Sequence, residues 1–102
     1  MPTAKDRHHP RIIEVAKALG DPVRLRIIAA LPRTAECELV LNVNELAQAL
    51  ALPQSTVSRH LAILRRAGLV QHERMCRDVY YWADPEALGE GAALIQGLAK
   101  AR

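Results

Sequence analysis

The feature that most constrains this chain is the segment of residues 50–84, LALPQSTVSRHLAILRRAGLVQHERMCRDVYYWAD. Pro53 preorganises the first turn of a helix and Gly68 ends it, so residues 54–67 are predicted to be helical. After Gly68 the apolar residues alternate, which predicts strands at 69–75 and 78–84 joined at Cys76 and Arg77. A helix followed by a hairpin is therefore the first predicted part of the fold.

The predicted helix has two different faces. Val57, Leu61 and Leu64 recur at helical spacing and are expected to be buried. The other side carries Gln54, Ser55, Ser58, Arg59, Ala62 and Arg66. This polar side is expected to face outward, where its amide, hydroxyl and guanidinium groups are free to bind a partner.

Capping signals predict the remaining helices. Residues 11–19 place Ile12, Val15 or Ala16, and Leu19 on one stripe. Aspartate followed by proline opens helices at 22–31 and at 85–101, and Asn42 with Glu45 forms a capping-box pattern before a helix that ends near residue 50. In the helix of residues 22–31 the residues expected to point inward are Leu25, Ile28 and Leu31. Residues 39–41 are suited to a short strand.

The predicted order is four helices, a hairpin and a helix, which is a mainly α fold with a small β-hairpin. We expect residues 1–10 to be a flexible arm and residues 11–102 to form a single domain. The 102-residue chain is half apolar and a quarter charged, as in soluble globular proteins. Its apolar runs are far shorter than the roughly 20 residues of a membrane span. Because the N-terminus lacks an apolar core, no signal peptide is expected and a cytoplasmic location is predicted.

The positive charge of the chain is concentrated in one region. The net charge is +3, and residues 54–82 contain five arginines but only two acidic residues. A basic segment of this kind is typical of nucleic-acid binding. A solvated charged face without a partner is the alternative.

A helix–turn–helix places the N-terminal side chains of its second helix in the DNA major groove. Gln54 suits adenine and Arg59 suits guanine, while serine and threonine hydroxyls suit bases or phosphates. The predicted DNA-binding residues are Gln54, Ser55, Thr56, Ser58, Arg59, His60, Arg74 and Arg77. No carboxylate pair, phosphate loop or nucleophile–base arrangement can be assembled, so an enzyme is not expected.

Three segments at matching spacing, ALGDPVRLRIIAAL, NELAQALALPQSTVSRHLAILRRAGLV and DVYYWAD, resemble the ArsR/SmtB family of winged helix-turn-helix repressors. The resemblance covers roughly residues 12–84. It implies a homodimer through the first and last helices, double-stranded operator DNA as partner, and release of that DNA when an inducer binds. In many members the inducer is a metal or metalloid ion. The apolar stripes of both terminal helices also favour a dimer, and Gly91 and Gly97 are expected to allow close helix approach.

The standard sensor sites of this family are missing. Asn42 and Asn44 stand where metalloid sensors often carry a Cys-x-Cys pair, and amides are poor ligands for soft metals. The last helix offers Asp84, Glu86 and Glu90, but no histidine follows His72. No metal site is therefore assigned, although a soft metal or metalloid cofactor stays open.

Two thiols remain as candidate sensing residues, Cys37 before the third helix and Cys76 at the wing turn. They are too few for a disulfide framework. Three interpretations of the cysteines are open: ordinary cysteines, a redox or electrophile sensor, or a cysteine metal site shared with a partner subunit. His8 and His9 form either a metal-binding arm or an ordinary polar terminus. The predicted function is a DNA-binding repressor that releases its operator on sensing a thiol-reactive signal or a soft metal. The alternatives are a protein-interaction module of the same fold and a ligand-independent autorepressor.

Overall fold

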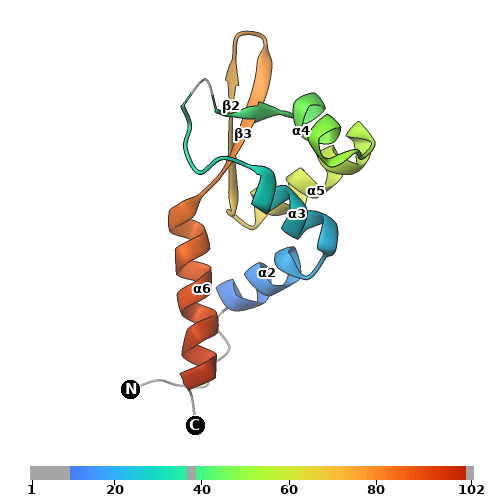
Figure 1. Cartoon of the computed structure of the whole chain (residues 1–102). Helices are drawn as coiled ribbons and strands as arrows, with labels where there is room; N and C mark the ends of the chain where they lie inside the picture. The colour runs from blue at the N-terminus through green and yellow to red at the C-terminus, as the bar shows by residue number, and fades with distance from the viewer. Residues whose placement is uncertain (1–9, 37–38, 101–102) are drawn as a thin grey trace.

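The computed structural model describes residues 10–36 and 39–100, which form five helices and a three-stranded sheet (Figure 1). The predicted order of elements is confirmed. In chain order the elements are α2 (Pro10–Leu19), α3 (Pro22–Ala30), β1 (Leu41–Asn42), α4 (Val43–Leu50), α5 (Gln54–Arg66), β2 (Val70–Met75), β3 (Asp78–Ala83) and α6 (Pro85–Lys100). Within these residues no helix is both long enough and apolar enough to cross a membrane.

The predicted caps fix where the helices begin. Asp21 accepts hydrogen bonds from the backbone N–H groups of Val23 and Arg24, at 2.8 and 3.2 Å, ahead of α3. Asn42 and Glu45 form the expected capping box, in which each side chain accepts from the other residue's N–H, at 2.7 and 2.9 Å. These local bonds satisfy N–H groups that a helix start leaves unpaired, so the sequence signals were sufficient here.

The core lies where α2 to α5 meet the base of the sheet. Its buried side chains are Val15, Ala18, Ile27, Ile28, Leu31, Leu46, Ala47, Val57, Leu61, Leu64, Ala67, Leu69, Val70 and Ala83. The stripe predicted on the helix of residues 54–67 is confirmed, and in α2 the buried residue of the pair Val15 and Ala16 is Val15. The inward position predicted for Leu25 is wrong, since this side chain is 51% exposed. The buried face of α3 centres on Ile27 and Leu31, with Ile28 at its edge, and Leu25 lies about 60° beyond Ile28 around the helix.

The sheet is antiparallel in the order β1-β3-β2. Strand β1 pairs Leu41 with Tyr81 and adds a third strand to the predicted hairpin. Of the strand suggested at residues 39–41, only Leu41 lies in β1. Met75 pairs with Asp78 across a turn made by Cys76 and Arg77, whose φ angles are 50° and 72°. Two successive positive φ angles are typical of a two-residue hairpin turn that follows the twist of the strands. The hairpin of β2 and β3 is called the wing below.

The molecule is elongated, measuring 49 × 24 × 17 Å, with the wing at one end and the C-terminal part of α6 at the other (Figure 1). Helix α6 packs against α2 at Gly91, where an added Cβ would lie 3.1 Å from a methyl group of Val15. At Gly91 the close approach is therefore between two helices of one chain, and the approach predicted across a dimer is not tested by it. At Gly97 no atom of another described element lies within 4 Å of the corresponding position.

Candidate nucleic-acid interface

Helices α4 and α5 form the predicted helix–turn–helix. Ala51 adopts the left-handed conformation, with φ 55° and ψ 46°, directly after α4. Leu52 N–H then donates to Ala47 O at 3.0 Å, and Pro53 leads into α5. This compact turn sets α5 at a fixed angle to α4, and both helices bury apolar residues in the same core.

The outer face of α5 is polar, as predicted. Gln54, Ser55, Ser58 and Arg59 are exposed, whereas Thr56 is half-buried beside the core. No side chain caps the start of α5, because the N-cap position is Pro53. The first N–H groups of the helix, with the positive end of its dipole, therefore remain available to an anion such as a phosphate.

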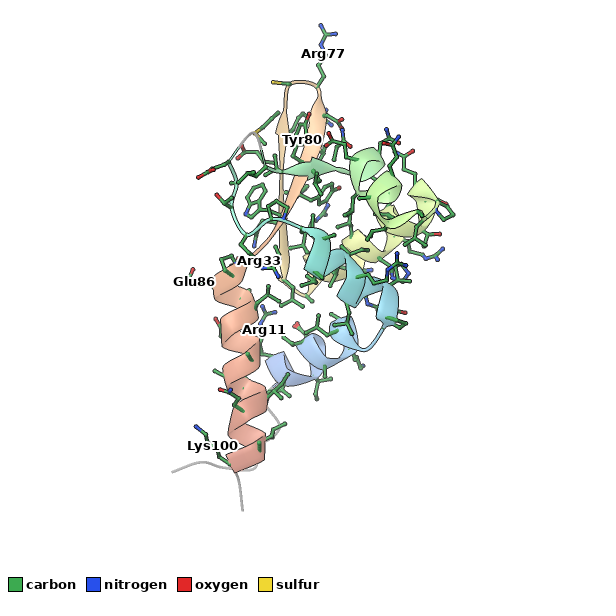
Figure 2. All side chains as sticks on the ribbon, in the orientation of Figure 1. Arg11, Arg33, Arg77, Tyr80, Glu86 and Lys100 are labelled. Carbon is green, nitrogen blue, oxygen red and sulfur yellow. The ribbon has the colours of Figure 1, made fainter. Side chains whose placement is uncertain are left out.

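The wing carries the two other predicted arginines. Arg74 and Arg77 are both exposed, and Figure 2 shows Arg77 at the tip of the hairpin pointing away from the rest of the molecule. Cys76 precedes Arg77 in the turn and is also exposed. The wing thus presents positive charge on an element that projects beyond the core.

His60 differs from the other predicted contact residues, because it is half-buried on the side of α5 that faces α3. Its Nδ1 atom lies 3.1 Å from Nη1 of Arg24. A guanidinium only donates, so His60 Nδ1 is the acceptor in this contact. The contact ties α5 to α3 and gives His60 a role inside the protein.

The same arginine also binds the end of α2. Arg24 Nε donates to Ala18 O at 2.6 Å, and Nη2 donates to Lys17 O at 3.1 Å. Burial raises the pKa of nearby Asp21, but the N–H donors of Arg24 and Val23 and the charges of Arg24 and His60 outweigh it. The pKa of Asp21 therefore lies below its ordinary value.

The arginine contacts to helix ends were not predicted from the sequence. Besides those of Arg24, Arg11 Nη1 donates to Ala67 O at 2.5 Å and Arg33 Nη1 donates to Leu31 O at 2.6 Å. Each satisfies a carbonyl group near the end of a helix. Arg11 and Ala67 are 56 positions apart, so no local sequence pattern signals their contact.

The candidate sensing residues are not brought together within the described residues. Cys37, His8 and His9 lie outside them. No group of three or more histidine, cysteine, aspartate or glutamate side chains there has a metal-binding arrangement. Asn42 caps α4 and donates from Nδ2 to Asp78 at 2.7 Å, while Asp84 accepts from the Ala87 N–H at the start of α6. Two of the residues compared with the family's metal ligands thus serve as helix caps.

Comparisons with known proteins agree with this geometry. Residues 21–72 match the family described as "Bacterial regulatory protein, arsR family". The chain is 44% identical over 68 residues to the HTH-type transcriptional repressor SmtB of Mycobacterium tuberculosis, an alignment that covers 67% of this chain and 47% of that repressor. The chain therefore spans about half the length of this relative.

Two solved structures have the same fold. An ArsR-like transcriptional regulator from Rhodococcus sp. RHA1 superposes with a TM-score of 0.77 at 24% identity, covering 90% of this chain and 80% of that one. The homodimeric winged helix-turn-helix DNA-binding domain Mb0332 from Mycobacterium bovis superposes with a TM-score of 0.70 at 27% identity. That alignment covers 97% of this chain and 87% of the other, so the winged helix-turn-helix fold is confirmed.

Proposed function

The chain belongs to the ArsR family of bacterial regulatory proteins, and on that premise we propose that it is a sequence-specific DNA-binding transcriptional repressor. One observation carries the proposal most directly: Gln54, Ser55, Ser58 and Arg59 are exposed together at the uncapped start of α5. This is the part of a helix–turn–helix that enters the major groove. A regulator of this family is not expected to be an enzyme.

The roles within the interface follow from side-chain chemistry. Arg59 and Gln54 read base edges, because guanidinium and amide groups form paired hydrogen bonds with guanine and adenine. Ser55, Thr56 and Ser58 contact bases or phosphates from the same turns of α5. Arg74 and Arg77 hold the backbone through the wing. His60 acts by positioning α5 through Arg24, since its Nδ1 is engaged inside the protein.

The protein acts as a two-fold dimer in this proposal, with the terminal helices forming the interface. Ile13 of α2 and Ile95 and Leu98 of α6 are 50%, 44% and 46% exposed. Exposed large apolar side chains gathered on two packed helices favour association. The Mycobacterium bovis domain is homodimeric, which supports a dimer but does not say which helices form it. Binding to chromosomal DNA would place the protein in the cytoplasm.

The proposed repressor releases its operator in response to a signal, and thiol chemistry is one route to it. Cys76 is exposed in the wing turn next to Arg77. Oxidation or alkylation there would add charge or bulk at the proposed phosphate contact. A Cys76→Ser variant, titrated with operator before and after peroxide treatment, tests this route. Equal loss of affinity by the parent and the variant would exclude Cys76 as the sensor.

The experiment that tests the main proposal separates base reading from phosphate binding. An operator is first selected in vitro from random duplexes, and the parent chain is then titrated with the operator and with random DNA at one salt concentration. Arg59→Ala and Gln54→Ala should each weaken operator binding by about 1–3 kcal/mol while changing random-DNA binding much less. Arg65→Ala, a change in an exposed arginine of the last turn of α5, is the matched control. Failure to select any sequence would contradict the proposal.

A further inference from the structure

A shallow cavity of about 350 Å³, open to solvent, lies between α2, α3 and α5, apart from the DNA-facing residues proposed on α5. Its volume is within the range of small-molecule sites, at the lower end. Ala18, Ile63 and Ala67 supply apolar walls. Its charged lining consists of Glu14, Lys17, Arg24 and Arg66. Apolar walls beside charged groups can bind the body of a small ligand and fix its orientation.

The charged groups of this cavity favour an anion. Three cationic side chains face one carboxylate, and that carboxylate, Glu14, lies 4.0 Å from Nη1 of Arg11. Among the described residues no salt bridge joins Lys17, Arg24 or Arg66 to an acidic side chain. The Asp21 carboxylate interacts with the charge of Arg24, so two carboxylates stand against the three cations and the positive charge is in excess. A ligand with a negative charge would therefore be attracted to the cavity.

Arg24 is held in place before any ligand arrives. Its contacts to Lys17 O, Ala18 O and His60 Nδ1 fix the guanidinium plane at the cavity wall. A guanidinium carries five N–H donors. These contacts use three of them, so one N–H on Nη1 and one on Nη2 of Arg24 remain for a carboxylate or phosphate. Because the side chain is already ordered, binding an anion there costs less conformational entropy than at a free arginine.

The cavity lies between the two helices whose relative position matters most for the proposed function. Its walls come from α2, a proposed dimer helix, and from α5, the recognition helix. Arg11 joins α2 to the end of α5 at Ala67 O, and Arg24 joins the end of α2 to His60 of α5. Figure 2 places Arg11 beside α2 on the side of α6. A ligand that touches both helices favours one spacing between them.

We propose that this cavity is an effector site for a small organic anion, an apolar body bearing a carboxylate or a phosphate. The ligand's charge pairs with Arg24, Arg66 and Lys17, and its body packs on Ile63 and the two alanines. The proposal that this ligand regulates the protein rests on the proposed function, because the spacing of α2 and α5 matters only if α5 binds DNA. The site uses neither thiol, so it is a separate input from Cys76.

The test uses the full chain, labelled with nitrogen-15, and four probes: benzoate, phenyl phosphate, neutral benzamide and inorganic phosphate. Benzoate or phenyl phosphate, or both, should shift the amide signals of Ala18, Ile63 and Ala67. The two probes distinguish a carboxylate ligand from a phosphate ester. Benzamide and inorganic phosphate should bind at least about tenfold more weakly, because each lacks either the charge or the apolar body.

Variants show whether the shifts report this cavity. Lys17→Gln combined with Arg66→Gln should weaken binding about tenfold or more, whereas Arg65→Gln, next to Arg66 but outside the cavity lining, should not. Arg24→Gln should also weaken probe binding. If the Arg24→Gln protein does not fold, the double variant of Lys17 and Arg66 alone tests whether the probe binds in this cavity. No shift with either aromatic anion, or equal weakening by Arg65→Gln, would overturn the site.

A DNA titration with and without the better probe tests the coupling. Saturating probe should change operator affinity about fivefold or more in the parent and leave the Lys17/Arg66 variant unchanged. A chain that binds the probe in the cavity but selects no operator would refute the proposed function and retain the site. A chain that binds operator but no probe would refute the site alone, and an unchanged operator affinity at full probe occupancy would refute its effector role.

Discussion

Ala51 occupies a backbone conformation that glycine adopts at lower cost. Its φ of 55° follows α4 directly, where a left-handed residue ends the helix. The Cβ of an L-residue is crowded in that conformation, at a cost of roughly 1–2 kcal/mol. Because α4 and α5 must meet at a fixed angle, this strain is kept within the turn of the helix–turn–helix.

Replacing Ala51 with glycine should therefore stabilise the protein, by about 0.5–1 kcal/mol after the entropy that glycine gains in the unfolded chain is subtracted. Ala49→Gly is the matched control, since Ala49 is exposed inside α4, where glycine costs roughly 1 kcal/mol. Urea unfolding followed by circular dichroism measures both. Destabilisation of similar size in both variants would contradict the assigned conformation of Ala51.

Asp21 is expected to make the stability of the fold depend on pH. Its pKa is lowered in the folded protein, despite burial, by the Arg24 and Val23 N–H groups and the charges of Arg24 and His60. A carboxyl group with a depressed folded pKa stabilises the fold above its unfolded pKa of about 3.9 and loses that contribution as the pH falls through the folded value. The stabilising effect is therefore complete at neutral pH.

Asp21→Asn keeps an oxygen acceptor for the cap but removes the charge. We expect the parent to be more stable than this variant at about pH 7, with the difference shrinking as the pH is lowered below about 4. Urea unfolding of both proteins across this range measures the difference. A difference that does not change with pH would mean that the charge of Asp21 contributes nothing.

At the scale of elements, the wing is the clearest test of how the protein holds DNA. Each arginine that neutralises a phosphate adds about 0.9 to the slope of log K against log salt for duplex DNA. Arg74→Ala and Arg77→Ala should each lower that slope by about this amount, for operator and random DNA alike. Fluorescence anisotropy over a range of salt concentrations measures the slope.

Lys100→Ala is the control for the wing, because Figure 2 shows Lys100 at the end of the molecule opposite Arg77. Its loss removes the same charge and should leave the slope unchanged. Equal slopes for the parent and both wing variants would show that the wing does not contact DNA phosphates. The proposed base contacts of α5 would be unaffected by that result.

The elements themselves were largely predictable, because their signals are local. Pro53, Gly68, Asp21 and the Asn42–Glu45 pair act on backbone groups within a few residues, so the sequence placed most helix ends within one residue of those observed. The contacts that join elements were not predictable in this way. Arg24 with His60, and Gly91 with Val15, depend on how the helices pack, and no periodicity in the sequence encodes that packing.

The same distinction holds for the candidate interface. The exposed face of α5 was predictable, since the buried stripe of Val57, Leu61 and Leu64 determines which side remains outside. The engagement of His60 by Arg24 was not, because the two residues are 36 positions apart. The cavity of the effector proposal is likewise made by three helices together, and it emerges only from the complete fold.

At the scale of the whole molecule, the terminal helices present more apolar surface than one chain covers. Gly91 already packs on Val15 inside the chain, whereas Ile13, Ile95 and Leu98 remain close to half exposed. Burying such side chains against a second copy contributes roughly 25 cal/mol for each Å² removed from water. A two-fold pair formed in this way would present two copies of α5 to half-sites about 34–36 Å apart along DNA.

We predict that the parent sediments as a dimer at micromolar concentration and that Ile95→Glu combined with Leu98→Glu shifts it to a folded monomer, because burying two unpaired carboxylates is costly. Leu39→Glu is the control, since Leu39 is also 50% exposed but lies outside the terminal helices, and this variant should remain dimeric. The monomeric variant should also bind a two-half-site operator much more weakly than the parent, because its two recognition helices are no longer linked. A parent that sediments as a folded monomer would contradict the dimer, and dissociation by Leu39→Glu alone would place the interface elsewhere.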